Sequence, residues 1–151
     1  MIDLYEELTG LLGDLSARGV GHALCGGLAL AVHGIPRATM DIDLLVPPES
    51  LEVAGSVLRE HGYTLKAADM CFADGKVRIT RFTKTDTESD DFLSVDLLEV
   101  TPSLRTVWEQ RQAVEWEGGT ITTVSRQGLI DLKSLRGSGQ DRDDIDKLRE
   151  Q

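Results

Sequence analysis

A chain of 151 residues is long enough for one compact domain with a sizeable core and too short for two ordinary ones, so we expect a single domain over residues 1–151. Its 40% hydrophobic and 28% charged residues are typical of a soluble globular protein and exclude a disordered tail. The net charge of −10 argues against a long nucleic-acid partner, which would favour a basic stripe. It is compatible with a small-molecule substrate or a divalent cation, or it serves only to keep the protein soluble.

The chain lacks sequence signals for a membrane or for export. No apolar run approaches the roughly 20 residues that cross a bilayer. The start, "MIDLYEELTG", is acidic and amphipathic and does not resemble a signal peptide. We therefore expect a cytoplasmic protein without a membrane partner, in which Cys25 and Cys71 are buried free thiols. Three scattered histidines give no zinc-ligand spacing.

In chain order, leucines at helical intervals predict an amphipathic helix over residues 2–17. "HALCG" is then a short buried strand, followed directly by a short helix, "GLALAVHG". "TMDIDLLV" is typical of a central strand and ends at Pro47–Pro48. Glu49 to His61 reads as a second surface helix that stops at Gly62.

The second half begins with strands. "YTLKA" and "KVRITRFTK" alternate by twos, which turns Val77, Ile79 and Phe82 inward. An acidic loop, "TDTESDD", separates them from the apolar strand "FLSVDLLEV". A short helix through Trp108 follows, with Thr101 or Ser103 as its cap.

The chain then closes with a hairpin and two helices. "QAVEWEGGTITTV" indicates a hairpin that turns at Gly118 and Gly119. The helices are expected at Ser125–Leu135 and Asp141–Arg149. Strands and helices in this order predict an α/β (α+β) fold, a mixed sheet with flanking helices in one domain.

Two acids interrupt an apolar strand at Asp41 and Asp43. Residues two apart in a strand share a face, so both carboxylates point one way and Ile42 the other. Adjacent carboxylates repel unless a cation lies between them, and Mg²⁺ suits hard oxygen ligands. Asp96 interrupts a second apolar strand and would join them if the two strands pair. The alternatives are a solvated edge strand for the first two, and an arginine partner at a strand end for Asp96.

Gly26 and Gly27 lie where a strand ends and a helix begins. Backbone N–H groups at such a point can hold a phosphate, and glycine lets a bulky anion approach closely. The chain has no Walker A pattern. A phosphate site followed by a D-x-D strand suggests metal-assisted phosphoryl chemistry on a nucleoside triphosphate. The alternative is merely a tight turn between strand and helix.

Four further polar residues are candidates. Arg37 and Thr39 lie in the loop before the D-x-D strand, within reach of a phosphate, although an ordinary surface arginine is an alternative. Lys133 lies among leucines and an isoleucine, so its stem should be half buried. Asp141 falls on the inward face of the last helix, where it would pair with Lys133 or would favour the positive end of the helix dipole. His33 reads as a core or cap histidine.

Taken together, these residues resemble a known family. The run G-G-x-A-x-x-x-H-G-x-x-R-x-T-x-D-I-D resembles the nucleotidyltransferase superfamily with its polymerase-β-like core. It looks closest to the AbiEii-like and minimal nucleotidyltransferase (MNT) branch, and the closing "LIDLKSLRGSGQDRDDIDKL" is similar to the AbiEii-like ending. The family normally has a serine where this chain has Gly27, and a separate acceptor domain is missing.

The resemblance implies a role for each candidate. Asp41, Asp43 and Asp96 would be the metal ligands, for Mg²⁺ or Mn²⁺, and with Lys133 the catalytic residues. The nucleotide-binding residues would be Gly26, Gly27, Arg37, Thr39, Lys133 and Asp141.

The expected activity is transfer of a nucleoside monophosphate from an NTP to an acceptor hydroxyl, within a toxin–antitoxin or defence system. The acceptor stays open between a protein, tRNA and a small molecule, and a partner protein or a homodimer is a further expectation. The alternative is a catalytically inactive module that binds a nucleotide or a partner.

Overall fold

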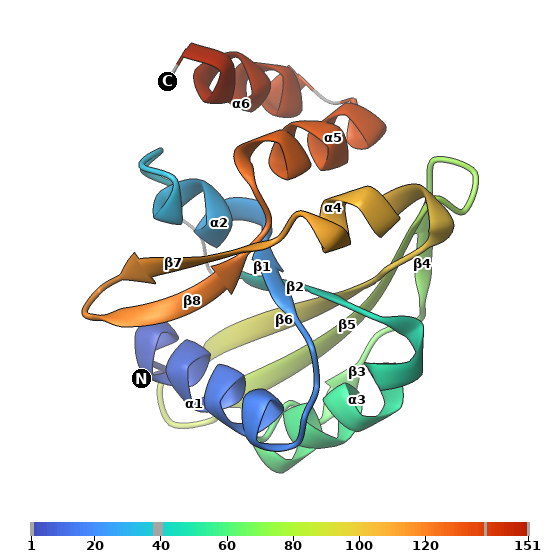
Figure 1. The fold of residues 1–151 in the computed structure, drawn as a ribbon. Helices are drawn as coiled ribbons and strands as arrows, with labels where there is room; N and C mark the ends of the chain where they lie inside the picture. Colours follow the sequence, from blue (N-terminus) through green and yellow to red (C-terminus); the bar gives the residue numbers. More distant parts are fainter. Residues whose placement is uncertain (1, 38–40, 138, 151) are drawn as a thin grey trace.

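A mixed β-sheet runs through the molecule, with helices on both of its faces (Figure 1). This computed structural model describes residues 2–37, 41–137 and 139–150. The helices in these ranges are α1 (Leu4–Ala17), α2 (Gly26–Val32), η1 (Pro48–Ser50), α3 (Leu51–Glu60), η2 (Pro102–Leu104), α4 (Arg105–Glu109), α5 (Arg126–Arg136) and α6 (Gly139–Glu150). The strands are β1 (Ala23–Cys25), β2 (Asp41–Val46), β3 (Leu65–Lys66), β4 (Met70–Phe72), β5 (Val77–Asp86), β6 (Asp91–Glu99), β7 (Gln112–Trp116) and β8 (Gly119–Thr123).

The strand order is β3-β5-β6-β2-β1-β8-β7, and β4 pairs with β5 outside this path. β2 runs parallel to β6 and β1 runs parallel to β8, whereas the other pairs are antiparallel. β2 therefore lies between β6 and β1 in the middle of the sheet. The predicted α/β class, the mixed sheet and the central position of the D-x-D strand are confirmed.

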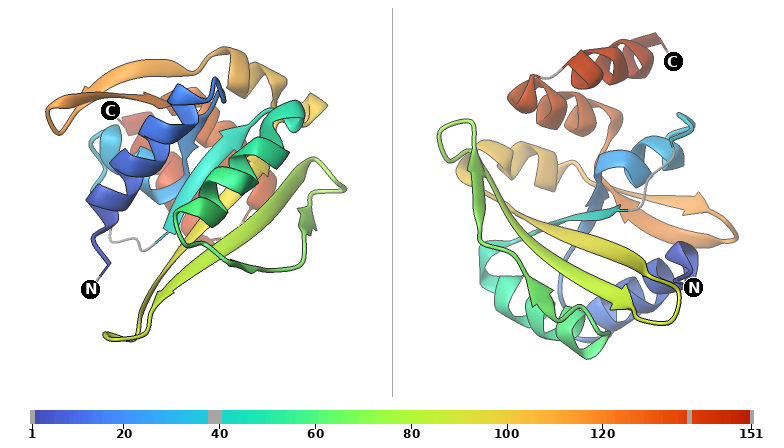
Figure 2. Two further views of the ribbon diagram at one scale, coloured as in Figure 1. Left: turned by 90° about the horizontal axis from the view of Figure 1, so that it is seen from below. Right: turned by 180° about the vertical axis from the view of Figure 1, so that it is seen from behind.

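The helices form two layers. α1 and α3 cover one face of the sheet, and α2, α5 and α6 lie on the other, as the front and rear views agree (Figures 1 and 2). α1 buries Leu8, Leu11 and Leu15, which recur at helical spacing. Ile42 is fully buried on β2. The opposite face of β2 is left for the acids, beneath α2 and α5.

The final helices begin and end at recognisable caps. The Ser125 side chain accepts a hydrogen bond from the backbone N–H of Gly128 at 3.0 Å and caps α5, which ends at Gly137 in the left-handed conformation. α6 packs back on α5 as a helical hairpin. It begins at Gly139, two residues before the expected Asp141.

Several expected elements differ in detail. "YTLKA" forms only the two-residue β3, and the short edge strand β4 was not predicted because it follows a polar run. η1 precedes α3. β5 extends to Asp86 because that residue pairs with Asp91, so the acidic loop is shorter than expected. Val77 and Phe82 are buried as predicted, on opposite faces of β5, and Ile79 is partly buried.

Two side-chain expectations are corrected. Thr101 precedes η2 but does not cap it through its side chain, because its hydroxyl donates to the backbone carbonyl of Lys76 at 2.6 Å. Both cysteines are free, and Cys25 is buried. Cys71 is exposed, since it lies on the edge strand β4. None of the helices in the described ranges has the length and apolar character needed to cross a membrane.

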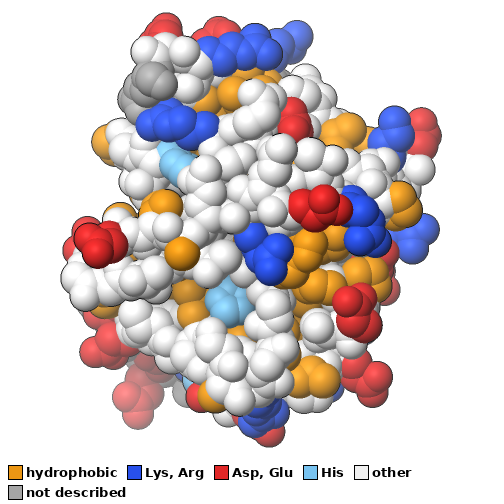
Figure 3. Space-filling model, in the orientation of Figure 1, with side chains coloured by type: hydrophobic (Ala, Val, Ile, Leu, Met, Phe, Trp, Pro, Cys, Tyr) orange, Lys and Arg blue, Asp and Glu red, His pale blue; other side chains and the backbone are white. Residues whose placement is uncertain are grey.

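Charge is unevenly spread over the face seen in Figure 3. A row of basic side chains lies near the top with acidic side chains beside it, and several acidic side chains lie around the lower edge (Figure 3).

Candidate active site

Four side chains, an arginine, two aspartates and a cysteine, form one row across the sheet. Arg81 of β5 is the register partner of Asp96 of β6, Asp96 is the partner of Asp43 of β2, and Asp43 is the partner of Cys25 of β1. Side chains at paired positions point to the same face of a sheet. The row therefore brings Asp43 and Asp96 together, although they are far apart in the sequence.

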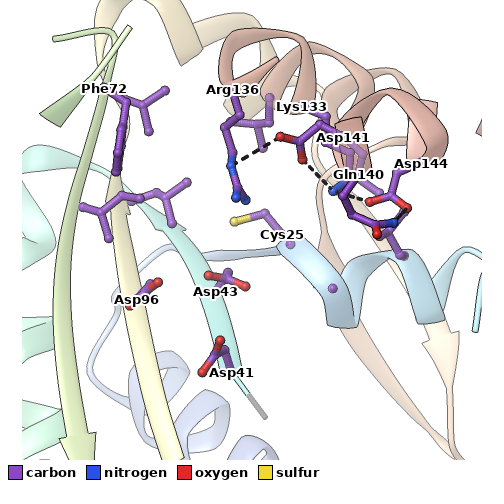
Figure 4. Close-up of a pocket in the computed structure, with 18 of the residues that line it drawn as sticks. Cys25, Asp41, Asp43, Phe72, Asp96, Lys133, Arg136, Gln140, Asp141 and Asp144 are labelled. Atoms are coloured by element: carbon purple, nitrogen blue, oxygen red, sulfur yellow. Dashed lines mark hydrogen bonds and ion pairs between the residues drawn. The ribbon is translucent and has the colours of Figure 1, made fainter. Parts of the chain in front are cut away.

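Asp41 and Asp43 point to the same face as this row. Both line the cavity that contains Asp96, and the three carboxylates point into it (Figure 4). Burial, followed by the charges of Asp96 and Asp41, raises the pKa of Asp43 from 3.8 to about 7. The positive charges near Asp43, those of Arg136 and Arg81, therefore do not offset burial and the neighbouring acids. Burial and the charges of Asp43 and Asp96 also raise the pKa of the Cys25 thiol, so that side chain is an unreactive neighbour.

The Asp43 side chain packs closely against the backbone of Gly26. A Cβ atom at Gly26 would lie 2.1 Å from Oδ2 of Asp43, and the backbone φ of +69° also disfavours other residues. Cys25 at the helix N-cap provides no side-chain hydrogen bond to the first turn of α2. The first glycine thus lets the D-x-D strand approach the start of α2, and both glycines line the cavity.

Asp96 has an arginine partner, which was the alternative for this residue. Nε and Nη2 of Arg81 donate to Oδ1 and Oδ2 of Asp96 at 2.8 and 3.0 Å. The hydrogen bonds to Asp96 raise the pKa of Arg81, which stays a cation. Asp96 itself is buried, with 5% of its surface exposed. Its two carboxylate oxygens are therefore engaged, even though it lies beside Asp43.

The carboxylates fit a divalent cation only in part. Asp41 and Asp43 offer hard oxygen donors, and the raised pKa of Asp43 reflects burial followed by the negative charges of Asp96 and Asp41. Among the described residues, however, no three His, Cys, Asp or Glu side chains form a cluster tight enough to hold a metal ion. The expected three-carboxylate cluster is therefore not closed in this arrangement, because Arg81 holds Asp96. Asp41 and Asp43 fit as ligands of a divalent cation, and the role of Asp96 as a third ligand stays a prediction.

A second charged network lies on the α5–α6 side of the cavity. Nζ of Lys133 is 2.9 Å from Oδ2 of Asp144 and 3.5 Å from Oδ1 of Asp141. Arg37 also donates to Asp144, and Nε of Arg136 lies 3.6 Å from Oδ2 of Asp141. Both acids are almost fully buried, so the predicted pairing of Lys133 with Asp141 is present. Asp141 also lies in the first turn of α6, which is the position expected of an acid that interacts with the helix dipole, the alternative interpretation of this residue.

Asp144 contacts two cations of this network, Lys133 and Arg37. Burial alone would raise its pKa, but hydrogen bonds from Arg37 and Lys133 outweigh burial and hold the pKa below its usual value. Asp144 therefore stays ionised and fixes two cations at the edge of the cavity.

The cavity joins these parts into one space of about 450 Å³. Asp41, Asp43 and Asp96 lie along one side, with Lys133, Asp141 and Asp144 above α2 and Phe72 across from them (Figure 4). Arg37 lines it, whereas Thr39 falls outside the described residues. His33 caps α2 and donates through Nε2 to the carbonyl of Val124 at 2.8 Å, as expected of a structural histidine.

Two residues of the site were missed from sequence. Arg81 shares a strand face with Val77 and Ile79, which was visible, but its pairing with Asp96 depends on the β5–β6 register. Asp144 lies three residues after Asp141, on the same helical face, so the helical period contained a signal for it.

Solved structures similar to this chain include nucleotidyltransferases. The chain resembles TM1012 of Thermotoga maritima, assigned as a nucleotidyltransferase, with a TM-score of 0.67 and 17% identity over 97% of this chain and 93% of that one. It resembles the lincosamide antibiotic adenylyltransferase LnuA in its lincomycin-bound form, with a TM-score of 0.61 and 16% identity over 95% of both chains. It also resembles ANT(2″)-Ia in complex with adenylyl-2″-tobramycin, with a TM-score of 0.61 and 14% identity over 95% of this chain and 85% of that one.

The fold of this chain is thus similar to that of these nucleotidyltransferase structures. The chain is a member of the family described as "Uncharacterised nucleotidyltransferase", whose sequence profile matches residues 2–130. A sequence search of the curated proteins found no match. The match ends within α5, so Lys133 and α6 lie beyond it.

Proposed function

We propose that this protein is a Mg²⁺-dependent enzyme that moves a nucleoside monophosphate from an NTP to the hydroxyl group of a small molecule. The observation that carries the proposal is the raised pKa of Asp43, which lies beside Asp41 and Asp96 in a cavity that also holds Lys133. Half-buried acids beside other acids, such as Asp43 and Asp41, suit a cationic ligand, and Lys133 suits phosphate oxygens.

The position of each residue in the cavity suggests its role. The backbone N–H groups of Gly26 and Gly27 would face the β- and γ-phosphates, and Lys133, Arg37 and Arg136 would orient them from the α5–α6 side. Asp41 and Asp43 would hold Mg²⁺ or Mn²⁺, which when bound neutralises phosphate charge and steadies the leaving pyrophosphate. Asp141 and Asp144 would keep the cations in place.

The transfer step forms one P–O bond, breaks another, and moves one proton to a residue of this chain. The acceptor oxygen attacks the α-phosphorus and forms a new P–O bond, while the bond from that phosphorus to the oxygen bridging to the β-phosphate breaks. Pyrophosphate leaves, and the hydroxyl proton passes to a carboxylate oxygen of Asp96. Asp96 can take that proton only after Arg81 has released one of its oxygens.

The experiment follows the α-phosphorus of each of the four NTPs. Wild-type protein with Mg²⁺ and a small-molecule extract should give a labelled product, and Asp43→Asn should give none. An Asp146→Asn variant is the matched control, since Asp146 is an exposed acid on α6. Equal inactivity of wild type and Asp43→Asn with every NTP would end the catalytic proposal.

A second candidate is a module that binds a nucleotide without turning it over. The paired state of Asp96 favours it, because both of its oxygens are occupied by Arg81. Gly27, where the resembled family has serine, also supports it. Calorimetric titration with Mg²⁺ and a non-hydrolysable NTP separates the two: a binding module gives heat of binding but no labelled product.

The biological setting is a finer part of the proposal. The closing segment "LIDLKSLRGSGQDRDDIDKL" supports the AbiEii-like or MNT branch, hence a cytoplasmic role in toxin–antitoxin or defence systems. A partner protein or a homodimer would fit such a role. The neighbouring gene tests it, because a toxin–antitoxin pair is encoded together. The lincomycin and adenylyl-tobramycin in the similar structures support a small-molecule acceptor over a protein or tRNA.

A further inference from the structure

One wall of the cavity is apolar and borders the reacting centre. Its residues come from β4, β5 and β6 and are in register: Phe72 pairs with Val77, Met70 pairs with Ile79, and Ile79 pairs with Leu98. All five line the cavity, and we call them the apolar wall. Two residues further along the same strands, the next pair is Arg81 with Asp96. The apolar wall therefore continues directly into the row of acids.

The apolar wall is open to a ligand. Val77 and Leu98 are mostly buried, but Phe72 keeps 46% of its surface exposed while it faces the cavity (Figure 4). An exposed aromatic ring beside charged groups is a typical anchor for an apolar part of a ligand. Phe92 is exposed to a similar degree, 54%, but does not line the cavity.

Reaction geometry assigns this wall to the acceptor. The attacking and leaving oxygens of phosphoryl transfer lie roughly in line with the phosphorus. The leaving pyrophosphate belongs to the side of Gly26, Gly27 and Lys133, so the acceptor must approach from the opposite side. Asp96 and the apolar wall lie across the cavity from Lys133, Asp141 and Asp144 (Figure 4).

We propose that the acceptor is a small hydroxyl compound with a flat apolar group, which packs on the apolar wall while its hydroxyl meets Asp96. This inference rests on the proposed nucleotidyl transfer and names its second substrate class. All five wall residues are uncharged, and the charged pair next to them, Arg81 with Asp96, is already balanced. A polycation finds no counter-charge on this wall, so the class excludes acceptors of the aminoglycoside type.

The test compares two acceptors that share their sugar hydroxyls, phenyl β-D-glucoside and methyl β-D-glucoside. ¹⁵N-labelled protein is saturated with Mg²⁺ and α,β-methylene-ATP and titrated with each, and the amide signals of Met70, Phe72 and Ile79 are followed. The phenyl compound should move these signals and bind at least about tenfold more tightly, from the burial of one ring face. Phe72→Ala should reduce that ratio to near one, and Phe92→Ala should leave it unchanged. Tobramycin, the polycationic probe, should leave the wall signals in place.

Three results would overturn the inference. They are equal binding of the two glucosides, wall signals that respond to tobramycin, and wall signals that move with the ATP analogue alone, which would make the wall a nucleobase site. Failure of the proposed function looks different: without nucleotide binding, the ATP analogue leaves the signals of Gly26, Gly27 and Lys133 unmoved, and with binding but no transfer, no α-labelled product forms. The glucoside titration of nucleotide-free protein still reports on the wall in that case.

Discussion

Asp43 and Asp96 lie directly opposite each other in the parallel pair formed by β2 and β6. Only Asp96 has a cation in register on its other side, Arg81, which donates to both of its oxygens. Of these two adjacent acids, the buried Asp96 is therefore compensated, and the half-buried Asp43 has its pKa raised to about 7. The ion pair at Asp96 and the charge deficit at Asp43 are the two properties on which the first predictions depend.

Removing Arg81 should free Asp96 as a ligand. We expect Arg81→Ala to bind Mn²⁺ several-fold more tightly than wild type, because a second uncompensated carboxylate then faces Asp43. The metal-free variant should lose about 1–2 kcal/mol of unfolding free energy, since a buried charge loses its hydrogen bonds. Calorimetry and urea unfolding in EDTA measure the two effects. Arg78→Ala is the control, because Arg78 is an exposed arginine of β5 with only a 3.8 Å contact to Glu99. Weaker Mn²⁺ binding by Arg81→Ala would contradict this account of Asp96.

Asp43 should make the metal-free protein less stable as pH rises. Its pKa is about 7 in the folded state against 3.8 ordinarily, so between these values the folded state binds more protons than the unfolded state. Stability from this group is therefore present at low pH and is lost as pH rises from about 4 to about 7. At 1.36 kcal/mol per pH unit, the loss is at most about 4 kcal/mol.

Urea unfolding in EDTA across this pH range measures the slope. Asp43→Asn should lack it and should be more stable than wild type at pH 8, while Asp146→Asn should behave as wild type. A wild-type stability that rises steadily from pH 5 to pH 8, unaffected by Asp43→Asn, would show that Asp43 is not charge-deficient.

Gly26 should tolerate no side chain. Gly26→Ala places a Cβ atom 2.1 Å from Oδ2 of Asp43 in a backbone conformation with φ of +69°. We expect a loss of about 2 kcal/mol or more and a loss of Mg²⁺–NTP binding, because Asp43 must move. Gly13→Ala is the control: it lies within α1 with open space around its Cβ position, so it should be neutral or slightly stabilising. Wild-type stability and binding in Gly26→Ala would show that this close approach is unimportant.

Asp144 should contribute strongly to stability, because it pairs with both Lys133 and Arg37 on the α5–α6 side of the cavity. Asp144→Ala removes the buried partner of Lys133 and Arg37, and breaking such a pair costs about 3 kcal/mol or more. Asp143→Ala, an exposed neighbour on the same helix, should cost little. Thermal unfolding compares the two variants. Equal midpoints would mean that Lys133 finds its support elsewhere.

The acids could be predicted from sequence because each breaks a local rule. Asp41, Asp43 and Asp96 interrupt apolar strands, and the face of each follows from the period of two. Arg81 could not be assigned, because alternation gives its face but not which residue of β6 stands opposite. That register is set by the whole β5–β6 hairpin, from Asp86 with Asp91 to Ile79 with Leu98.

On the α5–α6 side and at the apolar wall, too, local sequence pattern predicted only part of the arrangement. Asp141 was placed on the inward face by helical spacing, yet the preference of Lys133 for Asp144 depends on how α5 and α6 pack. The apolar wall was hidden because β4 is a three-residue edge strand whose pairing with β5 is non-local. Local pattern therefore located the acids and the glycines, and tertiary packing decided their partners.

The most direct measurement follows two labels in the same NTP. Wild-type protein with Mg²⁺ and an acceptor extract is given NTP labelled at the α-phosphorus or at the γ-phosphorus. We predict that the α label appears in a new product and the γ label in pyrophosphate, in equal amounts, and that Asp41→Asn and Asp43→Asn abolish both. Release of the γ label as inorganic phosphate with no α-labelled product, or undiminished transfer by the two variants, would contradict nucleotidyl transfer at this site.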